Sequence, residues 1–186
     1  LEEAGLQFQG VKASTKTHQL EDGTDFYSIN PNGYVPVLEL DDGTRLFEGP
    51  AINQYLADLA PQTKLAPANG SLARYQLQGW LNFLGTEVHK NYSPLWNPNA
   101  TDDAKAAAKA MLAKRLGYID AELGKKGPFL IGDTFTIADA YLFVVTNWSS
   151  MLDVDMSAFK NLNALRAKVA ERPSVQKAMK DEGLLG

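Results

Sequence analysis

Two short stretches early in the chain carry groups that could hold a small charged ligand. Val35-Pro36-Val37 puts a proline at the entry to a predicted strand, where it cannot donate a ladder hydrogen bond. A cis peptide bond would expose the Val35 backbone to a ligand, but base rates favour an edge strand with a trans proline. Glu48-Gly49-Pro50 opens a predicted helix, so Glu48 could bind an ammonium group and the Gly49 N–H a carboxylate. The alternative interpretation is simple helix capping beside a surface acid.

A third set of polar groups lies on a long predicted helix. Asn82, Thr86 and His89 are spaced four and three residues apart, so they share one face, and Lys90 adjoins them. This stripe could line a cleft between two domains, although a solvated face is commoner for an isolated helix. The opposite face is apolar and predicted to be buried, through Leu77, Leu81, Leu84 and Val88.

Thr136 and Asp139 form a fourth candidate at the start of a later helix. Their spacing is that of a capping box, with aspartate in place of the usual glutamate. A buried acid there could be catalytic or structural. We favour a structural role, in which Asp139 satisfies backbone donors at the helix start and its replacement harms folding first.

A short α/β segment must position the first two groups. Asp41-Asp42-Gly43 predicts a hairpin between strands over 35–40 and 44–47. A helix follows Gly49 and stops at Pro61, and its predicted buried face is Ile52, Leu56 and Leu59. Gly5 is expected to end a helix that is already under way at the start of the sequence.

The rest of the chain is predicted to be helical. Residues 64–71 are the candidate linker, followed by a helix over 72–90. Thr101 caps the next helix, which has an apolar stripe of Ala108, Leu112, Leu116, Ile119 and Leu123. Further helices begin at Thr136 and cover 162–170 and 174–180. The fold class is α/β plus all-α, with an N-terminal domain over 1–63 and an all-helical domain over 72–186.

Composition excludes several kinds of site. Among 186 residues there is no cysteine and only two histidines, which argues against disulfides and a zinc site. A net charge of -4 with dispersed basic residues argues against nucleic acid as a partner. No apolar run approaches the length of a membrane span. We expect a reduced, cytoplasmic compartment, and no metal.

These motifs, in this order, resemble the cytosolic glutathione transferases, most closely the bacterial beta class. The resemblance covers nearly the whole chain and rests on Asn30-Pro31-x-Gly33-x-Val35-Pro36, Glu48-Gly49-x-Ala51-Ile52-x-x-Tyr55-Leu56, Trp80-Leu81-Asn82, Thr86-Glu87-x-His89-Lys90, Phe135-Thr136-Ile137-Ala138-Asp139-Ala140 and Glu171-Arg172-Pro173. It implies a thioredoxin-like N-terminal domain, an all-helical C-terminal domain and assembly as a homodimer.

The resemblance also implies a role for each candidate. Pro36 would be a cis-proline, and the Val35 backbone would pair with the cysteinyl part of glutathione like an added strand. Glu48 and Gly49 would hold the γ-glutamyl end, and His18 stands where related beta-class enzymes have a lysine that contacts glutathione. Asn82, Thr86, His89 and Lys90 would approach the thiol. His89 would either assist with the proton or thiolate or act purely by position.

The implied reaction is attack of the glutathione thiolate on a hydrophobic electrophile, with glutathione as co-substrate and no permanently bound cofactor. Thiol reductase or peroxidase activity is a further expectation. The main thiol-activating residue is expected upstream of Leu1, so the N-terminal domain is expected to be incomplete. The alternative function is a non-catalytic protein of the same fold that binds glutathione or a protein partner. The aromatic residues Tyr92, Trp96, Phe143 and Trp148 are either an apolar pocket or core.

Overall fold

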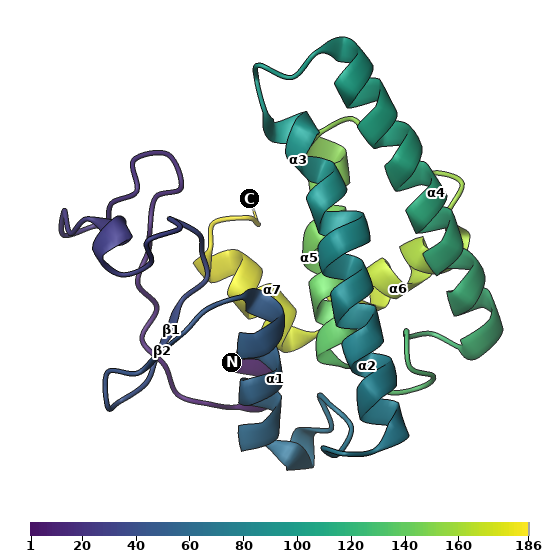
Figure 1. Cartoon of the computed structure of the whole chain (residues 1–186). Helices are drawn as coiled ribbons and strands as arrows, with labels where there is room; N and C mark the ends of the chain where they lie inside the picture. The colour runs from purple at the N-terminus through teal and green to yellow at the C-terminus, as the bar shows by residue number, and fades with distance from the viewer. Residues whose placement is uncertain (186) are drawn as a thin grey trace.

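The computed structural model describes residues 1–185 and has two parts, a small N-terminal part and a larger helical part (Figure 1). The N-terminal part holds the single-turn 3-10 helices η1 (Glu2–Ala4), η2 (Phe26–Ser28) and η3 (Pro61–Thr63), strands β1 (Leu38–Glu39) and β2 (Arg45–Leu46), and helix α1 (Gly49–Leu59). The helical part holds α2 (Leu72–Phe83), the π-helical η4 (Leu84–His89), α3 (Lys90–Trp96), α4 (Asp102–Lys126), α5 (Ile137–Met151), α6 (Lys160–Ala170) and α7 (Pro173–Asp181).

The predicted hairpin is present, but its strands are short. β1 and β2 are antiparallel, with Leu38 opposite Leu46 and Glu39 opposite Arg45. The turn between them places Gly43 at φ 82°, and the Thr44 N–H donates to the Asp42 carboxylate at 2.8 Å. Each strand has two residues rather than the predicted four to six. Residues 35–37 lie outside the ladder because the chain bends there at a proline that has no N–H.

Helix α1 begins and ends close to the predicted residues, but its buried face was partly misassigned. Ile52 and Leu56 are buried as expected, whereas Leu59 is 53% exposed. Ala57 and Ala60 are buried in its place. Small residues let the helix lie close to its neighbour, and hydrophobic spacing alone does not reveal this.

The helix predicted over 72–90 is longer than expected. α2, the π-helical segment and α3 follow one another without a break to Trp96. The residues predicted to be buried on this helix are all at most 2% exposed: Leu77, Leu81, Leu84 and Val88. π-helical turns occur mostly as short segments inside α-helices and are frequent at functional sites. Here the segment ends at His89.

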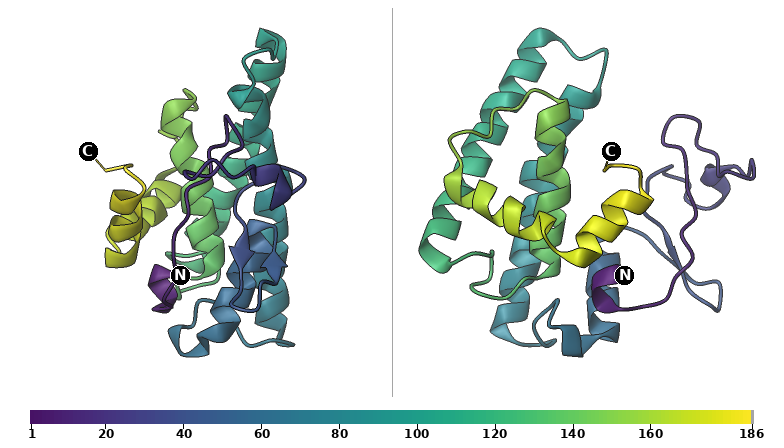
Figure 2. Two further views of the ribbon diagram at one scale, coloured as in Figure 1. Left: turned by 90° about the vertical axis from the view of Figure 1, so that its left-hand side faces the viewer. Right: turned by 180° about the vertical axis from the view of Figure 1, so that it is seen from behind.

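The core of the helical part surrounds α5, which packs against α1, α2, α6 and the π-helical segment (Figures 1 and 2). The predicted apolar stripe of α4 is fully buried, and the Thr101 side chain accepts the N–H of Ala104 at its start. α6 and α7 cover the predicted helices 162–170 and 174–180. α7 lies beside η1, which Gly5 ends at φ 66° as predicted.

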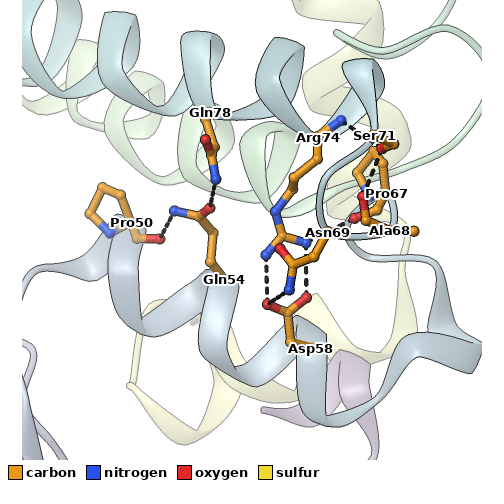
Figure 3. Close-up of polar contacts among 9 residues, drawn as sticks. All are labelled: Pro50, Gln54, Asp58, Pro67, Ala68, Asn69, Ser71, Arg74 and Gln78. Atoms are coloured by element: carbon orange, nitrogen blue, oxygen red, sulfur yellow. Dashed lines mark hydrogen bonds and ion pairs between the residues drawn. The ribbon is translucent and has the colours of Figure 1, made fainter.

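Polar contacts join α1 to α2 across the two parts (Figure 3). Arg74, which is 2% exposed, donates to both carboxylate oxygens of Asp58, at 2.8 and 2.6 Å. It also donates to the Pro67 carbonyl at 2.8 Å. Residues 64–71 contain neither helix nor strand, but the Arg74–Pro67 bond and the buried Leu65 fasten this segment to the helical part.

A second chain of bonds runs closer to the start of α1. The Gln78 amide donates to Gln54 at 3.0 Å, and the Gln54 amide donates to the Pro50 carbonyl at 3.2 Å (Figure 3). Because Pro50 follows Gly49 directly, these bonds tie the beginning of α1 to α2.

Candidate functional site

The Val35–Pro36 peptide bond is cis, against the base rate but as the family resemblance implied. Val35 is 47% exposed, and its backbone N–H and C=O form no hydrogen bond with another residue in 1–185. The loop before it is held by the Asn30 side-chain amide, which donates to the Tyr34 carbonyl at 2.7 Å. The Val35 backbone is therefore a free donor and acceptor on a fixed loop.

Glu48 lies next to this loop, at the N-terminus of α1. Its backbone has φ 65°, which is rare for a residue with a side chain. Its carbonyl accepts the first helical bonds, from Ala51 at 2.9 Å and Ile52 at 3.0 Å. A Cβ built on Gly49 would lie 3.9 Å from the Pro36 ring. This proximity brings the first two sequence motifs into contact, with the first N–H groups of a helix beside an exposed carboxylate.

The third motif is on the facing helix. Asn82, Thr86, His89 and Lys90 are all exposed. The Thr86 hydroxyl donates to the Asn82 carbonyl at 3.1 Å, which holds it against the helix. The His89 ring lies edge-on to Trp148, with the ring centroids 4.8 Å apart, and its Nδ1 is 2.7 Å from the Tyr141 hydroxyl.

Electrostatics connects the two sides of this site. Partial burial of the ring against Trp148 and Tyr141 lowers the pKa of His89 below its ordinary value of 6.5. Lys90 lowers it further, and the Glu48 carboxylate opposes them. Burial raises the pKa of Tyr141 to about 12, and the Glu48 carboxylate acts in the same direction. Glu48 is therefore within electrostatic range of both rings. At neutral pH the imidazole of His89 and the phenol of Tyr141 are therefore both uncharged.

His18 lies on the other side of the Val35 loop. Its backbone is left-handed, at φ 52°, and its ring is 4.6 Å from that of Tyr27. A Cβ on Gly33 would lie 3.0 Å from His18 Nδ1 and 2.7 Å from the Tyr27 ring. The His18 ring therefore packs against the backbone two residues before Val35.

Thr136 and Asp139 form the predicted capping box. Asp139 is fully buried, and its carboxylate accepts the backbone N–H groups of Leu130 and Thr136 and the Thr136 hydroxyl, each at 2.8 Å. Burial raises the pKa of Asp139, while these hydrogen bonds oppose the rise. Both of its oxygens accept hydrogen bonds from the protein itself, which agrees with the structural role.

Sequence reasoning missed Tyr141 as a member of the site. Tyr141 is far from His89 in the chain, so no local spacing links them. The available signal was on α5: Tyr141 and Trp148 are seven residues apart and share one helix face. Of the four aromatic candidates, Tyr92 and Phe143 are core, Trp148 contacts His89, and Trp96 is 49% exposed.

Residues 1–185 lack two further features. No three His, Cys, Asp or Glu side chains lie close enough together to hold a metal ion. None of the helices combines the length and hydropathy needed to cross a bilayer.

Comparison with known proteins agrees with this geometry. Residues 1–59 match the family description "Glutathione S-transferase, N-terminal domain" and residues 83–173 match "Glutathione S-transferase, C-terminal domain". The chain is 41% identical to glutathione S-transferase GstA of Escherichia coli O157:H7 over 99% of this chain and 91% of that protein.

Solved structures give the same result. A beta-class glutathione S-transferase from Sphingomonas chungbukensis superimposes with a TM-score of 0.95 at 45% identity, covering 99% of this chain and 91% of that one. A sphingomonad glutathione S-transferase complexed with glutathione has a TM-score of 0.93 at 44% identity, covering 98% of this chain and 90% of that one. The chain therefore belongs to the glutathione S-transferase family of enzymes, with the beta-class similarity that its motifs predicted.

Proposed function

We propose that this chain binds glutathione between the Val35–Glu48 side and the His89 side of the site and conjugates its thiolate to hydrophobic electrophiles. One observation carries the proposal: the free Val35 backbone and the Glu48–Gly49 helix start are adjacent, and Glu48 acts electrostatically on His89 and Tyr141. The family assignment favours this enzymatic function over the non-catalytic alternative.

In this proposal the N-terminal part binds the peptide. The Val35 N–H and C=O pair with the cysteinyl residue of glutathione as an added strand would. The Glu48 carboxylate holds the γ-glutamyl ammonium group, and the Gly49 N–H holds the γ-glutamyl carboxylate. His18, which packs against Gly33, contributes at the side of the loop away from Glu48.

The helical part then faces the thiol. Asn82, His89 and Lys90 offer side-chain N–H donors to a sulfur anion on their exposed face. Thr86 lies on the same face, and its hydroxyl proton is directed to the Asn82 carbonyl. Donors that favour the thiolate lower the thiol pKa and so increase the reactive fraction. The thiol proton leaves to a base or to water. The sulfur lone pair then forms a bond to the electrophilic carbon, and the leaving group departs with the electrons of the bond that breaks. Glutathione is a co-substrate, and the proposal requires no resident cofactor.

We also propose a homodimer that works in the cytoplasm. The beginning of α2 supports an interface, because Leu72 and Tyr75 are 76% and 61% exposed and large exposed apolar side chains that gather together mark interaction surfaces. Sedimentation at several protein concentrations tests this directly. A monomer at all concentrations would rule the homodimer out.

The test of function combines turnover with binding. The protein should accelerate the reaction of glutathione with a chromogenic electrophile above the uncatalysed rate. Glu48→Ala should weaken glutathione binding by roughly 1–3 kcal/mol, the range for losing a hydrogen-bonded charged partner. Glu21→Ala, at an exposed acid in the polar turn region, is the matched control and should leave affinity unchanged.

Two outcomes would contradict the proposal. If Glu48→Ala is folded and binds glutathione with unaltered affinity, the ligand does not use the assigned γ-glutamyl position. If the parent protein binds glutathione but gives no turnover with any electrophile tested, the non-catalytic alternative is correct.

A further inference from the structure

The His89 ring is fixed by two groups from α5 and presents one free nitrogen. Trp148 packs edge-on against it, with a centroid separation of 4.8 Å and an interplanar angle of 74°. The Tyr141 hydroxyl is 2.7 Å from Nδ1. Nε2 forms no hydrogen bond with any residue in 1–185, and His89 is exposed. The packing therefore sets the plane of the ring, and Tyr141 sets which edge faces outward.

The Tyr141 hydroxyl is held against the π-helical segment at a second point. A Cβ built on Gly85 would lie 3.7 Å from that hydroxyl oxygen, so the hydroxyl approaches Gly85 at a separation that just leaves room for a methyl group. Gly85 and His89 are both in the π-helical segment. Tyr141 thus lies against the π-helical segment at Gly85, near the segment's start, and at His89, its last residue. These two contacts fix the direction of the His89 side chain.

The direction of the hydrogen bond follows from the acidities of the two groups. The pKa of Tyr141 is about 12 and that of His89 lies below 6.5, so near neutral pH the phenol keeps its proton and the imidazole is neutral. A neutral imidazole has one donor nitrogen and one acceptor nitrogen. Its unprotonated nitrogen is a better acceptor than a phenol oxygen, so the phenol O–H donates and Nδ1 accepts.

The charged groups around this pair come from three directions. Glu48 faces it from the start of α1 and Lys90 adjoins it. On the α4 side of the π-helical segment, Glu87 is paired with Arg115 at 2.6 Å. Glu48 favours a protonated His89 and Lys90 disfavours it. Within residues 1–185, the His89 ring forms its hydrogen bond with Tyr141 and none with Glu48 or Lys90.

We propose that Tyr141 is a positioning residue whose hydroxyl donates to His89 Nδ1 and thereby fixes the tautomer that carries its proton on Nε2, directed at the sulfur of bound glutathione. The inference rests on the proposed function, because it assumes that the glutathione thiol lies near His89. In this arrangement His89 donates a hydrogen bond to the thiolate and does not need to exchange a proton with it. Tyr141 acts only through His89.

A double-mutant cycle in the kinetics tests the dependence on His89. Tyr141→Phe removes only the hydroxyl. We expect it to lower kcat/KM at pH 6.5 by roughly three- to tenfold and to raise the pH midpoint of kcat/KM by about 0.5–1 unit, as expected if the thiolate loses part of its stabilisation. In a His89→Ala background the same change should have little further effect. Tyr118→Phe, at an exposed tyrosine of α4, is the control.

Nitrogen NMR of the histidine rings tests the tautomer without any turnover. The chain has only two histidines, so His18 is an internal reference. We expect His89 to be in the Nε2–H form in the parent protein. In Tyr141→Phe the Nδ1 signal should move towards the chemical shift of an unprotonated nitrogen that accepts no hydrogen bond. The His18 signals should not change.

Several results would overturn the inference. An Nδ1–H tautomer in the parent protein would reverse the direction of the bond. An equal loss of activity from Tyr141→Phe with and without His89 would mean that Tyr141 acts directly. If glutathione binds and turnover is normal but the pH midpoint does not move in Tyr141→Phe, the positioning role fails while the proposed function stands. Failure of the parent protein to turn over would instead refute both.

Discussion

The ion pair between Asp58 and Arg74 provides a quantitative test of what holds the two parts of the molecule together. We predict that Asp58→Ala destabilises the protein more than Arg74→Met does. The reason is that the two side chains differ in exposure: the Arg74 side chain is 3% exposed and that of Asp58 is 38% exposed. Without Asp58, a buried guanidinium loses both carboxylate bonds; without Arg74, the carboxylate is left where water can reach it.

The magnitude follows from this geometry. Breaking a fully buried pair by removing one partner costs about 3–5 kcal/mol, whereas an exposed pair is worth about 0–1 kcal/mol. Because Asp58 is partly exposed and Arg74 keeps its bond to the Pro67 carbonyl, we expect a loss of roughly 2–3 kcal/mol for Asp58→Ala. Arg74→Met should cost about 1–2 kcal/mol, mainly from the Pro67 carbonyl that it leaves unpaired.

The assay is urea unfolding at one fixed protein concentration, because assembly would make stability depend on concentration. Trp80, Trp96 and Trp148 all lie in the helical part, so tryptophan fluorescence follows that part and circular dichroism at 222 nm follows the whole chain. Loss of the interface should lower the midpoints of both signals. If Asp58→Ala lies within 0.5 kcal/mol of the parent protein, on the scale of a neutral surface substitution, the reasoning is wrong.

The same pair predicts a pH dependence. The Arg74 hydrogen bonds hold the pKa of Asp58 below its ordinary value of 3.8, with burial opposing them. A carboxylate whose folded pKa is depressed stabilises the protein above its unfolded pKa, and that stability is lost as the pH falls through the folded pKa. The advantage of the parent protein over Asp58→Asn should therefore be complete at pH 7 and shrink below about pH 3.8. An advantage that is constant down to pH 2.5 would exclude a charge effect.

Three other predictions concern residues around the site. Asp139→Ala should cost about 3 kcal/mol or more in urea unfolding, because it leaves buried Leu130 and Thr136 donors unpaired; a loss of activity at unchanged stability would instead make Asp139 a site residue. Gly33→Ala should lower the free energy of unfolding by at least about 2 kcal/mol, since the new Cβ would lie 2.7 Å from the Tyr27 ring at φ 68°. Its control is Gly43→Ala, at φ 82° in open space, which should lower it by about 1 kcal/mol. Glu48→Gln should lower the pKa of His89 measured by NMR, because the carboxylate now raises it; an unaltered pKa would place Glu48 away from His89.

Much of the fold was predictable because its signals are local. Thr101, Thr136 and Gly5 mark helix ends through bonds within a few residues, and the α4 stripe repeats at helical spacing; all of these predictions were confirmed. Leu59 was predicted wrongly to be buried. Its helical spacing from Ile52 and Leu56 shows that the three share a face, but not how much of that face the rest of the protein covers. Which side of α1 is covered depends on α5, a partner about eighty residues further along the chain.

The site was only partly predictable, for the same physical reason. Residue type and motif made Val35, Glu48 and His89 candidates, and they remain predictions. No spacing in the sequence says that Glu48 lies within electrostatic range of His89. Tyr141 was missed because its role depends on a hydrogen bond across 52 residues. The π-helical segment was missed as well, because Leu84 and Val88 are four residues apart and both buried, a spacing that an ordinary α-helix also gives.

The contacts between α1 and α2 affect the candidate site as well as the stability of the protein. The groups proposed to bind glutathione from one side come from the loop at Val35 and the start of α1. Those proposed to face its sulfur come from α2, the π-helical segment and the first residue of α3. A displacement of about 1 Å between such groups can cost a hundredfold in rate. The Gln78–Gln54–Pro50 bonds join these two sides within one residue of Gly49. The separation between Glu48 and His89 is therefore set by the same contacts that hold the two parts together, so a variant that loosens α1 from α2 should lose turnover before it loses its helices.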